Sequence, residues 1–140
     1  MRVVVDTPIW SLVLRRRRGD LSAHENELVT SWARLVEDNR IVLVGPVRQE
    51  VLSGIRDTSV FECLRDTLRG FEDEPLTCDD YEEATRCRNR CQSAGLAGST
   101  VDCLLCAVTI RRNASLFTTD ADFTRYAKHL PLRLYAPGAR

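Results

Sequence analysis

The sequence has no apolar run long enough to cross a lipid bilayer. Its longest uncharged apolar stretch is 103–110, whereas a membrane helix needs about 20 residues. The beginning of the chain also lacks the apolar core of a signal peptide, because Asp6 interrupts a run of only three valines. We therefore expect a cytoplasmic protein without membrane contact, in which the cysteines stay reduced.

The sequence also lacks an excess of charge of either sign. Twenty Lys and Arg residues balance twenty Asp and Glu residues, so a basic groove over the whole molecule is not expected. Lysine itself is almost absent, since Lys128 is the single example and the other basic residues are Arg. Arg binds phosphate through paired hydrogen bonds. The composition is therefore compatible with a nucleic-acid partner without requiring one.

Histidine is scarce, and neither of the two histidines lies in a pattern typical of catalysis or metal binding. Six cysteines are present. Cys87-x-x-x-Cys91 and Cys103-x-x-Cys106 could together form a zinc site. Both pairs also fall within predicted helices, where cysteine behaves as a small apolar residue. We interpret them as core residues and keep the zinc site as the alternative.

A chain of 140 residues suits a single domain, here 1–140. β-Branched and apolar runs predict strands at 2–6, 41–44, 115–118 and 132–135, and a short one at 74–77. Helical patterns predict helices from Thr7 to the Arg15–Arg18 run, from Ser22 to Asn39, and over 46–55, 59–71, 79–93, 99–112 and 121–129. Alternating strands and helices imply a three-layer α/β/α sandwich around a central, mainly parallel sheet.

Several of these helices begin with a recognisable capping pattern. The spacing predicts capping boxes at Ser22-x-x-Glu25, Ser59-x-x-Glu62 and Ser99-x-x-Asp102. The pair 79–80 is expected to cap the helix that follows it.

Four acids lie where a parallel sheet places its ligand site, beyond the carboxyl ends of the strands. Asp6 ends the first strand, and Asp120 follows the strand at 115–118. Glu50 lies one turn into the helix after the second strand, and Asp102 lies in the first turn of a later helix. Each also has a structural explanation, since Asp102 and Asp120 could be helix caps and Glu50 a solvated residue. Asp6 is hardest to explain structurally, because Asp is a poor strand former.

Four carboxylates in one crevice repel each other, and a divalent cation removes that repulsion. A donor set of oxygen atoms alone favours Mg²⁺ or Mn²⁺ over Zn²⁺. Such an ion lowers the pKa of a bound water and stabilises the leaving oxygen of a phosphate ester. The cluster therefore predicts metal-dependent hydrolysis of phosphodiesters.

These residues, in this order, resemble the PIN domain of ribonucleases, and in particular the toxin subunit of VapBC toxin–antitoxin pairs. The resemblance covers essentially the whole chain and is carried by the stretches VVVDTPIW, GPVRQEVLSGIR, GLAGSTVDCLLCAVTIRR and SLFTTDADF. It implies that Asp6, Glu50, Asp102 and Asp120 are the catalytic, metal-binding acids. It also implies a supporting hydroxyl at Thr118 and a further acid at Asp122. Pro8 and Thr119 depart from the polar residues that the family usually carries at their positions.

The resemblance further implies a function. The chain would be a Mg²⁺- or Mn²⁺-dependent endoribonuclease, the toxin of a type II toxin–antitoxin system, leaving 5′-phosphate and 3′-hydroxyl ends. Its partners would be RNA, a second copy of itself and a small antitoxin that reaches the acids with a basic side chain. The alternative is a catalytically silent PIN-like module that binds RNA or protein. A receiver domain or a haloacid-dehalogenase phosphatase would need a second acid close to Asp6, and none is present there.

Two other features are left open by the sequence. The run Arg15–Arg18 is either a solvated helix end, where cations are favourable, or a contact for RNA or the antitoxin. Trp10 and Trp32 lie on apolar helix faces. We expect them in the core or an interface rather than as stacking platforms for bases.

Overall fold

A short parallel sheet lies at the centre of the computed structural model, which describes residues 1–138 apart from the side chain of Arg18. Within this part of the chain the strands are β1 (Val3–Val5), β2 (Ile41–Val42) and β3 (Ser115–Phe117), in the order β2-β1-β3. Both pairings are parallel, with Val4 opposite Val42 on one side and Leu116 on the other. The prediction of a parallel sheet is confirmed.

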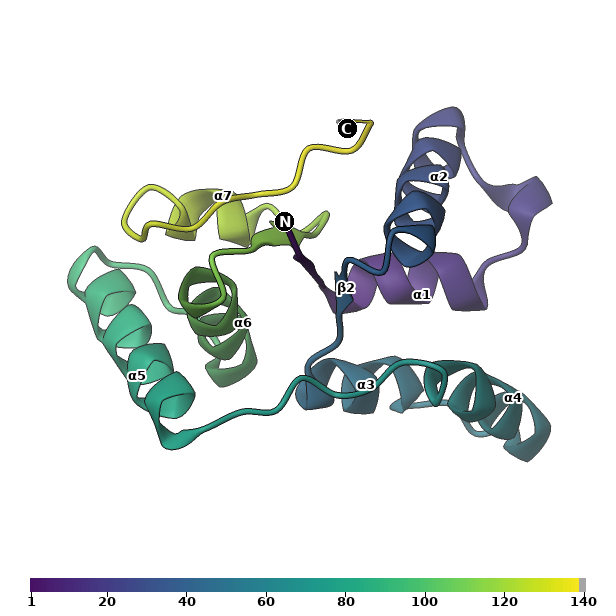
Figure 1. Cartoon of the computed structure of the whole chain (residues 1–140), viewed down its shortest axis with the longest axis horizontal. Helices are drawn as coiled ribbons and strands as arrows, with labels where there is room; N and C mark the ends of the chain where they lie inside the picture. Colours follow the sequence, from purple (N-terminus) through teal and green to yellow (C-terminus); the bar gives the residue numbers. More distant parts are fainter. Residues whose placement is uncertain (139–140) are drawn as a thin grey trace.

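Helices cover the sheet on both faces, as predicted. Their bounds are α1 (Thr7–Arg15), α2 (Ala23–Glu37), α3 (Gly45–Leu52), α4 (Thr58–Leu68), α5 (Cys78–Ser93), α6 (Thr100–Arg111) and α7 (Asp122–Tyr126). In Figure 1, α1 and α2 lie to one side of the strands and α5, α6 and α7 to the other, while α3 and α4 extend beneath α1. None of the described helices has the length and apolar character needed to span a bilayer.

The core is centred on β1 and on the tryptophan of α1. Val3, Val4 and Val5 are fully buried, which is expected for a central strand covered on both faces. The Trp10 indole N–H donates a 3.1 Å hydrogen bond to the carbonyl of Val5. Its ring packs edge-on against Trp32, with centroids 5.7 Å apart. Both tryptophans therefore pack against the core, as predicted, and α1 is fixed directly beside the end of β1.

The strand predicted at 74–77 is wrong. The chain makes only an isolated parallel bridge one residue earlier, between Leu43 and Asp73. Glu74 then donates its N–H to the Leu43 carbonyl at 2.8 Å. The next residue, Pro75, has no N–H to continue a ladder. The segment therefore touches the sheet edge at one point and turns away.

The strand predicted at 132–135 is reduced to a single parallel bridge between Leu134 and Leu116. The bridge is built by the Leu116 N–H on the Arg133 carbonyl and the Tyr135 N–H on the Leu116 carbonyl. Because β3 is itself only three residues long, it offers little further pairing. The segment covers the edge of β3 without becoming a regular strand.

The predicted capping residues of two helices are also wrong, because each helix is capped by an earlier residue. Helix α4 is capped by Asp57, which accepts the N–H of Val60 at 3.0 Å, so Ser59 lies inside the helix. Helix α5 is capped by Thr77, whose N–H is bonded by Asp80 at 2.9 Å. The predicted ends of α3, α4 and α7 at 55, 71 and 129 lie beyond the observed ones.

The side chain of Asp80 is completely buried and carries an ion-pair network that the sequence did not reveal. Arg111 donates to its Oδ1 at 2.9 Å and Arg112 to its Oδ2 at 2.9 Å. Hydrogen bonds from Arg112 lower the pKa of this carboxyl to about 2, despite the opposing effect of burial. The network joins the start of α5 to the end of α6, and Arg112 also bonds the Pro75 carbonyl at 2.9 Å.

The cysteines follow the core interpretation. Cys87, Cys91, Cys103 and Cys106 are buried on α5 and α6, which pack along each other. Burial raises the pKa of each of these thiols, that of Cys87 to about 11. Within residues 1–138, the group of side chains close enough to share a metal ion contains no cysteine. The arrangement is that of neutral thiols used as small apolar side chains.

Candidate active site

Asp6 lies at the point where β1 ends and α1 begins, and it is the N-cap of α1. Its side chain is 6% exposed. Oδ1 accepts the N–H of Thr7 at 2.8 Å and Oδ2 accepts the hydroxyl of Thr118 at 2.7 Å. Burial raises the pKa of this carboxyl, and the charges of Asp102 and Glu50 raise it further, while the two hydrogen bonds partly oppose the change. Asp6 is therefore oriented by its bonds, and a neighbouring cation would stabilise its charged form.

Asp102 lies in the first turn of α6, which Ser99 caps. The Ser99 hydroxyl accepts the Asp102 N–H at 3.0 Å. This is half of the predicted capping box, because the carboxylate is directed elsewhere: its Oδ2 accepts the Tyr126 hydroxyl at 3.3 Å. Burial raises the pKa of Asp102, and the charges of Asp120 and Asp122 add to the effect. The carboxylate thus faces other acids and not its own helix.

Asp120 is exposed and lies in the short loop between β3 and α7. Its N–H donates to the Thr118 hydroxyl at 3.0 Å, and its Oδ1 accepts the N–H of Asp122 at 2.9 Å. The alternative that Asp120 is the N-cap of α7 is wrong, because the N-cap is Ala121 and no side chain caps this helix. Carboxylate oxygens of Asp102, Asp120 and Asp122 all lie within 4.8 Å of one another. Asp122 therefore belongs to the cluster, although it is also paired with Arg125.

Glu50 is exposed on α3, and its Oε2 accepts the hydroxyl of Thr7 at 3.1 Å. Asp6 and Glu50 lie outside the tight group formed by Asp102, Asp120 and Asp122. Glu50 nevertheless lies near enough for its charge to raise the pKa of Asp6. The structure thus brings all four predicted acids to the same edge of the sheet, as one tight group with two further acids beside it.

Two residues at this site were missed in the sequence. Thr7 connects Asp6 to Glu50 through its N–H and its hydroxyl, and its place directly after Asp6 was a usable signal. Tyr126 is 4% exposed and its hydroxyl contacts Asp102. No local pattern indicates that contact, because it depends on how α7 packs against α6.

The donor set fits a hard divalent cation. Its members offer only carboxylate and hydroxyl oxygens, which suit Mg²⁺, Mn²⁺ or Ca²⁺ better than a soft metal. Burial is the main reason that the pKa values of Asp6 and Asp102 are raised, and the negative charges of neighbouring acids add to the effect. A cation bound between these carboxylates would remove that repulsion and would be positioned to bind a phosphate oxygen.

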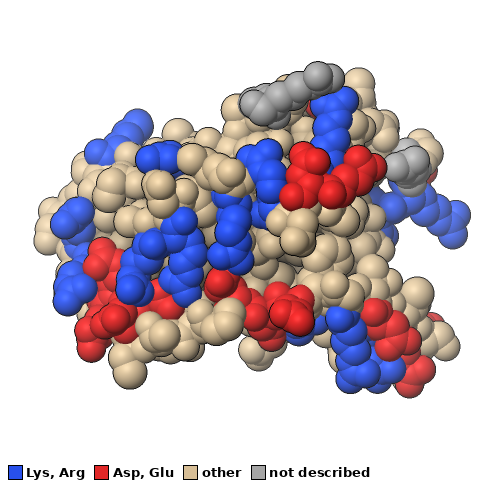
Figure 2. All heavy atoms as spheres, in the orientation of Figure 1, with Lys and Arg blue, Asp and Glu red and all other residues tan. Residues whose placement is uncertain are grey.

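The face of the molecule shown in Figure 2 is neither wholly acidic nor wholly basic. Figure 2 shows Lys and Arg side chains interspersed with Asp and Glu side chains over one face of the molecule. This agrees with the zero formal net charge of the chain. Attraction of a polyanion would therefore depend on local groups of Arg and not on the overall charge.

Comparison with known proteins identifies the family. The model of the PIN domain matches residues 3–129. VapC ribonuclease Mb1587 of Mycobacterium bovis and ribonuclease VapC11 of Mycobacterium tuberculosis are each 30% identical over 130 residues, covering 90% of this chain and 92% of the relative. A chain in the crystal structure of VapBC2 from Rickettsia felis, bound to a DNA fragment from their promoter, is similar in fold, with a TM-score of 0.75 and 20% sequence identity. The match covers 96% of this chain and 98% of that one. The chain belongs to the PIN domain family.

Proposed function

We propose that this chain is an endoribonuclease that depends on a divalent metal ion and acts as the toxin of a type II toxin–antitoxin pair. Asp6, Glu50, Asp102 and Asp120 are its catalytic and metal-binding acids, and the ion is Mg²⁺ or Mn²⁺. The carrying observation is the convergence of Asp102 and Asp120 on one site, beside Asp6, whose pKa is raised by burial and by the charges of Asp102 and Glu50. The mycobacterial relatives, named ribonucleases, support the same activity.

Each acid has a role that follows from how it is held. Asp102 and Asp120 would hold the ion, with Asp122 as an additional ligand, because their carboxylate oxygens lie within 4.8 Å of one another. Asp6 is fixed by Thr7 and Thr118 and completes the site. Glu50 is held by Thr7 at the exposed edge, where it orients the attacking water or accepts its proton. The bound ion supplies a more acidic water and stabilises the charge that develops on the phosphate.

The partners follow from the same site. RNA supplies the phosphodiester, and the site is blocked when a small antitoxin places a basic side chain among the acids, because such a charge replaces that of the metal. We also propose that the chain forms a homodimer. The VapBC2 structure of Rickettsia felis, which contains both toxin and antitoxin by name, supports a paired antitoxin here.

The test is incubation of the purified protein with total RNA in Mg²⁺ or Mn²⁺, with EDTA and an Asp102→Asn variant as negative controls. Asp38→Asn is the matched control, because Asp38 is exposed at the end of α2. We expect discrete cleavage that requires both the metal and Asp102 and that Asp38→Asn leaves intact. If the unaltered protein neither cleaves RNA nor binds Mn²⁺, the catalytically silent binding module is favoured instead.

A further inference from the structure

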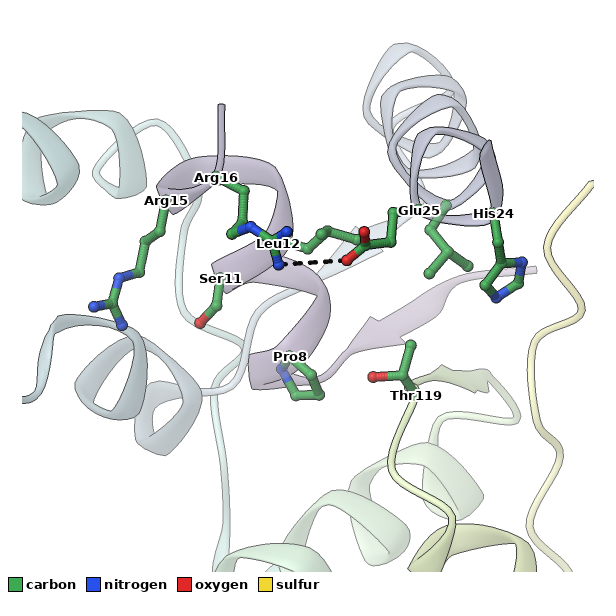
Figure 3. A pocket seen from close by; sticks show the side chains of 9 residues that line it. Pro8, Ser11, Leu12, Arg15, Arg16, His24, Glu25 and Thr119 are labelled. Carbon is green, nitrogen blue, oxygen red and sulfur yellow. Dashed lines mark hydrogen bonds and ion pairs between the residues drawn. The ribbon is translucent and has the colours of Figure 1, made fainter. Parts of the chain in front are cut away.

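A cavity of about 510 Å³ lies between α1 and the beginning of α2. Thr119 and Pro8 line its inner end (Figure 3). Thr119 lies directly between Thr118, which bonds Asp6, and the cluster member Asp120. The inner end of the cavity is therefore one residue along the chain from Thr118 and Asp120, which belong to the site where the acids gather.

The cavity has an apolar wall and a cationic rim. Its wall is formed by Leu12 and Leu28, which are 8% and 3% exposed. Arg15 and Arg16, at the end of α1, lie along its rim together with His24. In Figure 3, Arg15 extends away from the other labelled residues, whereas Arg16 reaches across toward α2. The apolar wall suits the base of a nucleotide, and the cationic rim suits its anionic phosphate.

Glu25, the acid among the described lining residues, already has hydrogen-bond and ion-pair partners within the protein. Glu25 accepts the Ser22 N–H at 3.0 Å and pairs with Arg16 at 3.4 Å. The bond from the Ser22 backbone is the largest cause that lowers the pKa of this carboxyl. Arg15 makes no ion pair with any residue in 1–138. The rim therefore has a cationic group available for a ligand, and the ligand that suits it is an anion.

We propose that this cavity is a nucleotide subsite, which binds a residue of the RNA chain next to the phosphodiester that is cleaved. This inference rests on the proposed function. The base lies against Leu12 and Leu28, since RNA is recognised mainly through unstacked bases that pack on side chains. A phosphate binds Arg15, because Arg pairs with phosphate through two hydrogen bonds. The volume lies in the range of sites that enclose small ligands.

RNA is favoured over a peptide by the position of the cavity. A phosphodiester bound at the acid cluster is covalently joined to its neighbouring nucleotides, so one of them must lie close to the cluster. Thr119, which lines the cavity, is the residue next to Asp120 of the cluster. A peptide would need acidic groups of its own to use Arg15, and the closeness of Thr119 to Asp120 would then have no role.

Two variants test the proposal in different ways. Arg15→Glu removes the rim cation, and Ser11→Trp fills the cavity from α1 without removing a core side chain. Arg69→Glu is the matched control, because it changes the charge equally at the exposed end of another helix, α4. All three are made in the Asp102→Asn protein, so that cleavage does not obscure binding. Melting temperatures identify any variant that fails to fold.

The measurement is the fluorescence anisotropy of a labelled single-stranded RNA in Mg²⁺. We expect both cavity variants to raise the dissociation constant about tenfold, and Arg69→Glu to leave it within about twofold. Equal weakening by Arg69→Glu, unchanged binding in the cavity variants, or no RNA binding at all would overturn the subsite. So would variants that retain RNA but lose a co-expressed antitoxin, which would make the cavity a protein interface. If RNA binding depends on the cavity but the protein with Asp102 intact cleaves no RNA, only the proposed function is contradicted.

Discussion

The hydroxyl group of Thr118 connects two acids, since it donates to Oδ2 of Asp6 at 2.7 Å and accepts the N–H of Asp120 at 3.0 Å. The first bond orients a buried carboxylate, and the second fixes the backbone of the loop that carries Asp120. One oxygen atom therefore sets the relative position of residues from the two ends of the chain. Residues that orient metal ligands in this way commonly change metal affinity by about 10- to 100-fold when replaced.

Thr118→Val tests this connection, because valine keeps the shape of threonine and removes the hydroxyl. We expect Mn²⁺ to bind about tenfold more weakly by isothermal titration calorimetry. Thr85→Val is the control, since the Thr85 hydroxyl bonds only its own helix, at the Tyr81 carbonyl and exposed to solvent. Equal affinity in the two variants would show that Thr118 does not orient the site.

Asp6→Asn should raise the melting temperature of the metal-free protein by about 3 °C and abolish its stabilisation by Mn²⁺. The pKa of Asp6 is raised in the folded protein, so at neutral pH its charge destabilises the fold. That destabilisation disappears as the pH falls through the raised pKa toward 3.8, the ordinary value. Thermal unfolding at several pH values should therefore show the advantage of the variant shrinking on acidification. A variant that still responds fully to Mn²⁺ would exclude Asp6 from the metal site.

Asp80→Asn should lower the free energy of unfolding by about 3 kcal/mol, because it leaves two Arg side chains without their buried partner. Urea unfolding measures the loss. Asp79→Asn is the matched control: its carboxylate is 73% exposed and lies 3.8 Å from Arg111, so a change of less than about 1 kcal/mol is expected. Since the pKa of Asp80 is lowered to about 2, its stabilisation is present above pH 3.8 and is lost as the pH falls through about 2.

Gly98→Ala should destabilise the protein by about 1 to 3 kcal/mol. A Cβ atom at this position would lie 2.9 Å from Sγ of Cys103 and 3.7 Å from the Tyr126 ring. Both neighbours pack at the start of α6, so the strain falls on the turn that carries Asp102. Gly19→Ala is the control, because its Cβ would meet none of the described atoms within 4 Å. Thermal melting curves compare the two, and equal melting temperatures would mean that the loop shifts to accommodate the methyl group.

Iodoacetamide should modify two of the six cysteines in the folded protein. Cys63 and Cys78 are exposed, whereas the other four are buried and have raised pKa values, so little thiolate is available to react. Mass spectrometry before and after denaturation in guanidinium counts the labels. Rapid labelling of Cys87 or Cys106 in the folded state would show that α5 and α6 separate.

The positions of Asp6 and Asp102 could be predicted because local signals fix them. A strand that ends in Asp before a Thr-Pro helix start places the carboxylate at the sheet edge, and Ser99 fixes the first turn of α6. The partners of Tyr126 and Asp80 could not be predicted, since each contact joins helices that are distant in sequence. The apolar pattern at 132–135 predicted a strand, but the structure has only one bridge there, because a strand also needs a partner of sufficient length and β3 has three residues.

The hydrogen bond between Thr118 and Asp6 joins residues 112 positions apart, and this separation has a consequence for synthesis. A nascent chain that has not yet reached Asp120 carries Asp6 and Glu50 but lacks the oxygens that complete the cluster. If these acids cleave RNA as proposed, a prematurely terminated chain of that kind would not cut the RNA around it, including the message from which it was translated. The proposed activity would thus be withheld until nearly all of the described chain has been made and folded.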